Sequence, residues 1–406
     1  VGSKRFLPKS LYQYSIIALF ALKHKACPLF IDSNRQGVYN EKDYPRKGGG
    51  AMKTLVIERD ALKNNISVVK ERAGGAVIYG VVTGDGQGAG LVELAKALRA
   101  EGIGRFAVSE VAEAAALRKA GFVEEEILML RCTTDREELE QLLDLNVICT
   151  VGSHDSGMAL NGVAEARSTI AEAHIQIDTG MGFGGFLSSE PEKILSTFRD
   201  LSSIAVSGVC TQLYTKSRKG KALAAQVEEF TKTVEAIHAA GFETGTVHAA
   251  GSYVLMHHPA ARLGGVRAGT VLMGRCRRAR GDGLRRVGYG EVKVEETRWV
   301  PKGHIVGGNT PAPLKKNTRV AVLPVGYQNG FGMGRPWAGG LLDAIRRWLT
   351  QRQITVRVNG QKARVIGGIG AIETIVDVTD LKCTAGDKAV FDIDPIFAKG
   401  FVREYR

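Results

Sequence analysis

Four side chains that can move protons follow segments predicted to be β-strands. Asp85, Asp178 and His248 lie at or just beyond the end of such a segment, and Lys216 follows the run Val209–Tyr214. Carboxylates, imidazoles and amines act as general acids and bases, and a lysine amine can also bond to a carbonyl compound. In parallel α/β proteins the carboxyl ends of the strands meet on one face, where ligands bind. We therefore expect a site on that face, with Lys216 and His248 as catalytic candidates.

These strand ends belong to a regular alternation of strands and helices that begins near Met52. The predicted strands are Ala76–Thr83, Arg105–Ser109, Ile127–Leu130, Val147–Val151, Ile175–Asp178, Val206–Thr211, Thr246–Ala249 and a short run near Val271. Amphipathic segments between them include Leu91–Ala100, Glu110–Ala120, Asp135–Leu143 and Ala222–Ala240. Eight strand–helix units favour a (β/α)8 barrel over an open sheet, and we assign residues 52–285 to it.

A different pattern begins at residue 286, where short β-branched runs alternate with turns. The runs are Glu291–Val300, Arg319–Val325, Ile354–Val358, Arg364–Ile366, Ile375–Val378 and Ala389–Phe391. They predict a separate all-β domain over residues 286–406. One insert, residues 341–349, has helical spacing with arginines opposite an apolar face, so we expect a helix there.

The charge of the chain is unevenly distributed. The formal net charge is +13, and residues 1–51 carry nine Lys or Arg against three Asp or Glu. The densest basic stretch of the remainder, Arg275–Arg280 with Arg285 and Arg286, lacks interleaved aromatic residues. We interpret it as a solvated loop and expect no nucleic-acid partner. The six cysteines have no spacing typical of a metal or redox site, so we expect reduced thiols, no metal and a cytoplasmic location.

Residues 1–51 differ in texture from the rest of the chain. The apolar run Ser15–Leu22 is too short to cross a bilayer, and no cleavage signal of a secreted protein follows it. The stretch Lys47–Met52 matches what a purine-rich ribosome-binding sequence and its spacer would encode, which favours Met52 as the native start. We therefore expect loose packing and no function in residues 1–51, and no membrane partner.

Seven motifs occur in the same order as in the alanine racemases, enzymes that use pyridoxal phosphate (PLP) on a barrel followed by a β domain. They are Leu55–Ile66, Ala76–Gly90, Ile177–Gly182, His248–Ser252, Val266–Thr270, Pro324–Gly330 and Val376–Asp380. From Met52 onward the chain is identified as a divergent member of this family, PLP fold type III. The resemblance implies the fold predicted above and a homodimer in which two chains form each active site.

The resemblance also implies that two catalytic groups are missing. In the family, a lysine at the end of the first barrel strand bonds to PLP and acts as one base, and a β-domain tyrosine acts as the other. Racemisation needs both, because the α-proton leaves from one face and returns to the opposite one. Thr83 and Gly307 stand at these positions. Threonine cannot bond to the PLP aldehyde as an amine does, so we expect no alanine racemisation.

Other positions of the family pattern have changed with these two. Gln87 replaces a tyrosine that contacts the phosphate, Gln176 a modified lysine, and Phe183 an arginine. Gly370–Ile372 replaces a Cys-Met-Asp motif. By resemblance, these substitutions remove the cationic partners of the substrate carboxylate.

The residues that match the family's cofactor contacts form a second set. Ser252, the backbone at Gly269 and Thr270, and Tyr327 correspond to phosphate contacts, and Arg267 corresponds to the arginine that faces the pyridine nitrogen. Hydroxyls, backbone N–H groups and a fixed cation can hold a phosphate dianion. We expect a small phosphorylated ligand, with PLP held without a covalent bond as one candidate.

Simpler roles and other functions stand beside this interpretation. Thr83 can merely line the barrel mouth, Arg267 can be an ion-pair partner, Tyr327 can pack in the β domain or at a dimer interface, and His248 can bond to the backbone. The chain can also be a PLP-dependent or PLP-independent isomerase with relocated groups, such as Lys216. A third alternative is a non-catalytic partner of an active family member.

Overall fold

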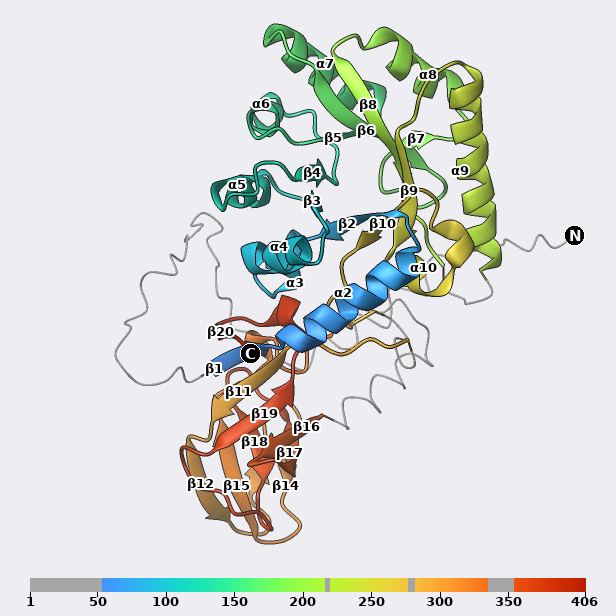
Figure 1. The fold of residues 1–406 in the computed structure, drawn as a ribbon. Helices are drawn as coiled ribbons and strands as arrows, with labels where there is room; N and C mark the ends of the chain where they lie inside the picture. The colour runs from blue at the N-terminus through green and yellow to red at the C-terminus, as the bar shows by residue number, and fades with distance from the viewer. Residues whose placement is uncertain (1–52, 216–219, 277–281, 335–353) are drawn as a thin grey trace, which may run out of the picture. The chain divides into compact units, whose positions relative to one another are not determined.

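The computed structural model describes residues 53–215, 220–276, 282–334 and 354–406. The segment 1–51, Lys216, residues 277–280 of the basic stretch and the predicted helix at 341–349 lie outside these residues. The described part contains eight parallel strands in one sheet, shown in Figure 1. They are β2 (Val77–Val81), β3 (Arg105–Val108), β4 (Glu126–Met129), β5 (Cys149–Val151), β6 (Ala171–Asp178), β8 (Ile204–Thr211), β9 (Thr246–Gly251) and β10 (Gly265–Ala268).

The sheet closes into a nearly complete barrel. Its strand order is β4-β3-β2-β10-β9-β8-β6-β5, and a parallel bridge between Leu128 and Ile148 joins the two ends. A short strand, β7 (Phe186–Leu187), pairs with β6. The predicted (β/α)8 barrel is therefore confirmed.

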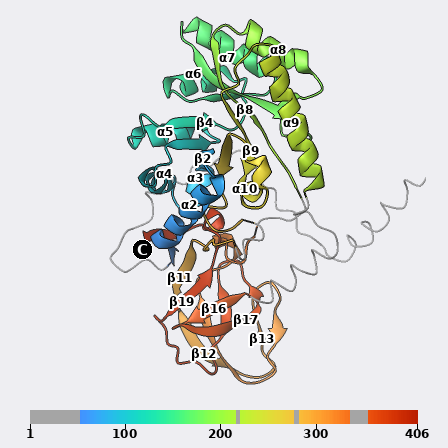
Figure 2. The same ribbon diagram turned by 45° about the vertical axis from the view of Figure 1, so that its right-hand side comes forward.

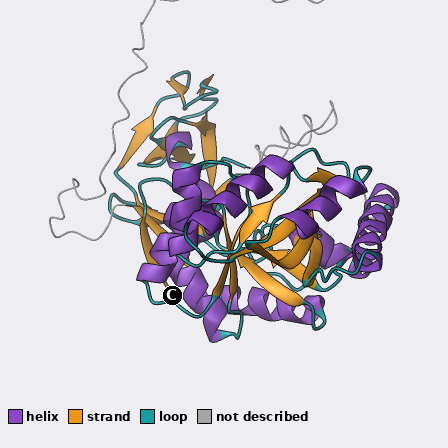
Figure 3. Ribbon diagram, turned by 90° about the horizontal axis from the view of Figure 1, so that it is seen from above, coloured by secondary structure: helices purple, strands orange, loops and turns teal. Residues whose placement is uncertain are grey.

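Helices lie outside the strands of this barrel, as Figure 3 shows from above. They are α2 (Arg59–Ala73), α4 (Leu91–Ala100), α5 (Val111–Lys119), α6 (Arg136–Asp144), α7 (His154–Ala166), α8 (Pro191–Asp200), α9 (Lys221–Ala239) and α10 (Ser252–His257). Each buries an apolar face; α9, for example, buries Leu223, Phe230, Val234 and Ile237 at helical spacing. None of the helices in the described part is long and apolar enough to span a membrane.

The limits of the barrel strands shift from the predicted ones, and the shifts at two strands affect the site. The last strand was predicted near Val271, but it is β10, and Val271 lies in the buried turn that follows it. The prediction was wrong because three consecutive apolar residues in a buried turn look like a short buried strand. Strand β6 begins at Ala171, four residues before the predicted start, and therefore includes His174.

A second sheet, of nine strands, contains most of the C-terminal region (Figure 2). In sheet order the strands are β12 (Glu296–Val300), β15 (Thr318–Leu323), β18 (Thr374–Asp377), β17 (Gln361–Ile369), β16 (Thr355–Val358), β19 (Lys388–Asp392), β11 (Tyr289–Lys293), β1 (Lys53–Ile57) and β20 (Val402–Tyr405). A small hairpin of β13 (Ile305–Val306) and β14 (Ala312–Pro313) stands apart. The predicted all-β domain is confirmed, and β1, which precedes the barrel in sequence, pairs within this sheet.

The glycine-rich run after β2 forms a left-handed turn. Gly84, Asp85 and Gly86 have φ angles of 65°, 53° and 64°. The turn closes through hydrogen bonds from the Gly88 N–H to the Gly84 carbonyl and from the Gly90 N–H to the Asp85 carbonyl, at 2.9 and 2.8 Å. Glycine adopts this conformation without the steric cost that other residues meet, which explains the composition of the run.

The C-terminal strand holds this turn in place. Arg403 Nε donates to the Gly88 carbonyl at 3.0 Å, and its Nη2 pairs with Asp85. The hydroxyl of Tyr405 donates to the Ala89 carbonyl. A Cβ atom on Gly88 would lie 2.1 Å from the carbonyl carbon of Pro395, so the backbones are in direct contact. The turn is a fixed structure and not a flexible loop.

Replacing Gly88 by alanine should therefore destabilise the protein more than the same change at Gly102. Both glycines have similar positive φ angles, of 84° and 82°, but no atom lies within 4 Å of a Cβ built on Gly102. Both variants lose about 1–2 kcal/mol from the left-handed backbone, and only Gly88→Ala adds about 1–3 kcal/mol of overpacking. Urea unfolding measures the difference, and equal losses would contradict the proposed contact with Pro395.

Candidate anion-binding site at the barrel mouth

The predicted site residues of the barrel lie on one face. Thr83 follows β2, Asp178 ends β6, Ser252 follows β9, and Gly269 and Thr270 follow β10. These are all carboxyl ends of parallel strands, the face on which barrel enzymes carry their sites. The barrel therefore gathers residues that the sequence separates by almost 190 positions.

Arg267, on β10, is the buried cation of this site. Only 8% of the residue is exposed. Nη2 donates to the Thr211 carbonyl at 2.7 Å and to Gln212 Oε1 at 2.8 Å, and Nη1 donates to His248 at 2.7 Å. These acceptors are neutral, and within the described residues no carboxylate contacts the guanidinium. Burial lowers the pKa of Arg267, but a guanidinium stays charged in proteins.

Two histidines behind Arg267 have a single consistent protonation pattern. Arginine only donates hydrogen bonds, so Nδ1 of His248 must be an acceptor and its proton must be on Nε2. That Nε2 lies 2.9 Å from Nδ1 of His174, which therefore accepts. Both rings are neutral in this arrangement. Both nitrogens of His248 are engaged inside the barrel, so the structure gives this ring a supporting role beneath Arg267 and leaves no nitrogen for a ligand.

Burial keeps these histidines neutral. It lowers the pKa of His174 to about 4, and the charges of Arg267 and Arg105 act in the same direction. Burial, Arg267 and His174 together hold the pKa of His248 well below its usual value. The ring of Tyr79 packs against both, with centroids 5.8 Å from His174 and 5.0 Å from His248. The barrel interior therefore fixes the rings that orient Arg267.

A hydroxyl and backbone N–H groups lie at the ends of β9 and β10. Ser252 Oγ accepts from the N–H groups of Gly269 at 3.1 Å and Val271 at 3.3 Å. Within the described residues, no acceptor is bonded to the N–H of Thr270, which lies between them. The predicted phosphate contacts Ser252, Gly269 and Thr270 are therefore brought together as one floor.

Thr83 is bonded to Gln87, the other altered position of the first motif. Gln87 Nε2 donates to the Thr83 carbonyl at 3.1 Å and to its hydroxyl at 3.3 Å. A Cβ built on Gly269 would lie 3.7 Å from the same nitrogen, so this amide lies over the floor. The two substitutions thus form one bonded pair beside the predicted phosphate contacts.

A similar pair connects β6 with the loop that follows it. Gln176 Nε2 donates to the carbonyls of Phe183 and Gly184, at 3.3 and 3.0 Å, while the Phe183 side chain is 73% exposed. Asp178 accepts from the N–H groups of the three residues 180–182, at 2.8–3.1 Å. Burial alone would raise the pKa of Asp178, but these N–H groups outweigh it and the pKa is lowered. Asp178 therefore orients its own loop and is a poor base.

The backbone at Gly307 packs tightly against another segment. Gly307 stands at the position predicted to correspond to the catalytic tyrosine of the family. Its φ angle is 135°, and a Cβ there would lie 2.3 Å from Gly367 Cα. A Cβ on Gly308 would lie 2.3 Å from the nitrogen of Gly370. Two glycine-containing segments pack backbone to backbone, so no larger side chain fits at Gly307 in this conformation.

Tyr327 lies in a turn of the β domain. It begins the 3-10 turn Tyr327–Asn329 of the β domain, its N–H donates to the Gly370 carbonyl, and the residue is 47% exposed. None of the hydrogen bonds among described residues connects it with Ser252 or Thr270. Across the described ranges no cluster of His, Cys, Asp or Glu could hold a metal ion.

The supporting residues Tyr79, His174 and Gln212 were not predicted from the sequence. His174 was missed because the strand was started too late, although its polar side chain in an apolar strand was a usable signal. Tyr79 looked like an ordinary core residue of its strand, and Gln212 became notable only through its bond to Arg267.

The neutral histidines predict a specific loss of stability in acid. In the unfolded chain histidine has a pKa near 6.5, whereas burial lowers the folded-state pKa of His174 to about 4. Its contribution is therefore complete above pH 6.5 and is lost as the pH falls toward 4. Between pH 8 and 5 the wild type should lose about 2 kcal/mol more unfolding free energy than His174→Asn.

Urea unfolding at several pH values measures this difference. The matched substitution His304→Asn, at an exposed residue, should show the same pH dependence of the unfolding free energy as the wild type. If His174→Asn keeps the full acid slope, the neutral pair does not exist.

Comparisons with known proteins agree with the architecture. The model of the alanine racemase N-terminal domain matches residues 57–276, and that of the alanine racemase C-terminal domain matches residues 290–394. An alanine racemase of Clostridium novyi (strain NT) is 29% identical over 332 residues, 80% of this chain and 81% of that protein. The alanine racemase structure from D-cycloserine-producing Streptomyces lavendulae has a TM-score of 0.78 at 20% identity, covering 88% of this chain and 98% of that one. The structure from Bartonella henselae, with covalently bound pyridoxal phosphate, has a TM-score of 0.73 at 20% identity, covering 88% and 100%. The chain therefore belongs to the alanine racemase family.

Proposed function

We propose that the barrel mouth binds a phosphorylated small molecule without a covalent bond and that the protein does not racemise alanine. One observation carries this proposal: the buried guanidinium of Arg267 bonds only to neutral acceptors among the described residues. A buried charge without a counter-charge is costly, so an anion at the barrel mouth would be favoured. A phosphate group is the anion that the neighbouring floor of Ser252, Gly269 and Thr270 accommodates best.

The floor offers the donors that a phosphate group needs. Thr270 has an N–H without an acceptor in the described structure, and the N–H groups of Gly269 and Val271 are held by a single rotatable hydroxyl, that of Ser252. A phosphate oxygen could take the place of that hydroxyl oxygen, because both accept hydrogen bonds. Ser252, Gly269 and Thr270 would hold the phosphate of PLP, and Arg267 would face its ring.

Covalent attachment of PLP does not fit the residues at the predicted lysine position. Thr83 carries a hydroxyl that already accepts a hydrogen bond from Gln87. When bound, PLP supplies an electron-withdrawing ring that activates amino acids. This activation also requires a bond between PLP and an amine, and a base positioned to remove the α-proton. Asp85, Asp178 and His248, the other candidate bases, are engaged by Arg403, by backbone N–H groups and by Arg267 with His174. These contacts favour binding over relocated catalysis.

We further propose a homodimer that acts in the cytoplasm. Phe183, Leu187 and Tyr214 are large exposed apolar residues near the carboxyl ends of β6 and β8, and a group of such residues is typical of a protein contact. The five described cysteines are free thiols, as in a reducing compartment. A complex with an active family member would use the same surface and is the alternative to the homodimer.

Titration with PLP and with pyridoxal tests the proposed ligand class. PLP should bind saturably and raise the melting temperature, and pyridoxal should bind at least about tenfold more weakly, because hydrogen bonds to a charged group contribute about 1.5–3 kcal/mol. Ser252→Ala should weaken PLP but not pyridoxal. The control Ser196→Ala, at a half-buried serine on α8 that bonds only within its own helix, should change neither.

Borohydride reduction followed by intact-mass measurement tests the absence of a covalent bond. We expect no stoichiometric adduct of PLP. An adduct on one lysine would contradict non-covalent binding, and equal affinity for pyridoxal and PLP would contradict the phosphate floor.

A further inference from the structure

A groove of about 420 Å³ lies on the second sheet, away from the barrel mouth. Strands β11, β16, β17 and β19 form it, together with the chain segments on either side of the barrel. It is lined by Glu58, Arg286, Gly288, Tyr289, Thr355, Arg357, Lys362, Val390, Phe391 and Asp392. Three of these residues are cations from three separate segments, and none of them was used in the site described above.

A tight turn places two of the cations directly opposite each other. Asn359 and Gly360, with φ angles of 49° and 79°, connect β16 to β17, and Asn-Gly is the preferred pair for such a two-residue hairpin. The resulting register pairs Val356 with Ala363 on the buried face and Arg357 with Lys362 on the other face. Like charges directly opposite on neighbouring strands destabilise a sheet. The fold therefore maintains a local concentration of positive charge.

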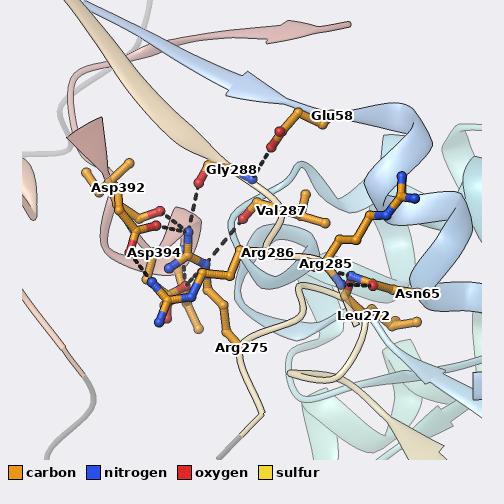
Figure 4. Close-up of polar contacts among 12 residues, drawn as sticks. Glu58, Asn65, Leu272, Arg275, Arg285, Arg286, Val287, Gly288, Asp392 and Asp394 are labelled. Atoms are coloured by element: carbon orange, nitrogen blue, oxygen red, sulfur yellow. Dashed lines mark hydrogen bonds and ion pairs between the residues drawn. The ribbon is translucent and has the colours of Figure 1, made fainter. Parts of the chain in front are cut away.

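The acidic residues of the groove do not neutralise this pair. Figure 4 shows Asp392 held by Arg275 and Arg286, at 2.8 and 2.6 Å, and Glu58 accepting from the Gly288 N–H at 3.2 Å. Arg357 donates to the carbonyl of Gly360, at 3.0 Å. In the described residues, no carboxylate forms an ion pair with Arg357 or Lys362.

We propose that this groove binds a phosphate-bearing small molecule between Arg357 and Lys362. The guanidinium of Arg357 can hold two phosphate oxygens at once, and the ammonium of Lys362 adds a second charge. Val390 lies next to Arg357 in the sheet, and Tyr289 lines the same groove, so an organic body attached to the phosphate would meet partly apolar surface. The site is independent of the ligand proposed for the barrel mouth.

The groove also lies beside the segments that connect the barrel with the second sheet. Arg275, which follows the last barrel strand, donates to the carbonyls of Gly288 and Ile393, at 2.8 and 2.6 Å. Glu58 is the residue between β1 and α2. The groove wall is thus made partly from the two places where the chain passes between barrel and sheet.

Melting curves with inorganic pyrophosphate provide the test. If Arg357 and Lys362 repel each other, removing one charge should not lower the melting temperature, whereas the loss of a structural residue would lower it. Without added anion, Lys362→Gln should melt at the same or a slightly higher temperature than the wild type. With pyrophosphate, the wild type should gain several degrees and Lys362→Gln should lose most of that gain. In calorimetric titrations Arg357→Gln/Lys362→Gln should bind at least about tenfold more weakly, which corresponds to about 1.4 kcal/mol.

The control Lys315→Gln/Lys316→Gln makes the same charge change at two exposed lysines of the second domain. It should keep the affinity of the wild type, and the groove variant should keep the PLP response of the barrel mouth. The same titrations on Ser252→Ala separate pyrophosphate bound at the floor from pyrophosphate bound in the groove. Equal weakening by the control, or an unchanged pyrophosphate response in the groove variant, would overturn the proposal.

Discussion

The contact between Arg267 and His248 determines the chemistry of the barrel mouth. Because a guanidinium only donates, it fixes the proton of His248 on the far nitrogen, and this in turn makes His174 an acceptor. The two rings can remain neutral because they are buried against Tyr79. The positive charge is thus oriented by neutral groups, in the manner of a preorganised anion site. If His248 carried a second proton, its ring would be a cation in direct contact with the buried guanidinium of Arg267.

The positions at which this chain departs from the family pattern are hydrogen-bonded to neighbouring groups or packed against backbone. Gln87 bonds to Thr83, Gln176 bonds to the backbone at Phe183, and Gly307 packs against Gly367. A site that had lost single residues without compensation would contain cavities or buried polar groups without hydrogen bonds. Each such polar group costs about 1–3 kcal/mol. The observed pairs avoid both. A single Thr83→Lys substitution would therefore have to displace Gln87, and it would not open space at Gly307 for a tyrosine.

Much of the fold could be predicted from local patterns. The alternation of strands and helices gave the barrel, and Leu91–Ala100 has the same limits in the prediction and in the structure. The partners of β1 could not be predicted, because its consecutive buried residues fit either sheet and its neighbours β11 and β20 come from distant parts of the chain. The run Val271–Met273 was misread because its apolar side chains are buried by a turn, to which hydrophobic patterning is blind.

The site was less accessible to sequence reasoning than the fold. Single positions such as Thr83 and Arg267 could be picked out by resemblance, but their partners come from other strands and depend on the closure of the barrel. The tautomers of His174 and His248 follow from one distance each, and no sequence pattern contains such distances. The left-handed turn at residues 84–86 could not be predicted from its local sequence, because Arg403 and Tyr405 hold the adjoining residues from the other end of the chain.

We propose that the mouth retains an anion site and lacks both groups that move the α-proton. Exchange of the α-proton of alanine in D2O, followed by proton NMR with PLP present, tests this proposal, since exchange requires only one working base and detects even a half-functional site. We expect no exchange beyond that caused by free PLP. Enzyme-dependent exchange in L- or D-alanine, at rates that scale with protein concentration, would contradict it.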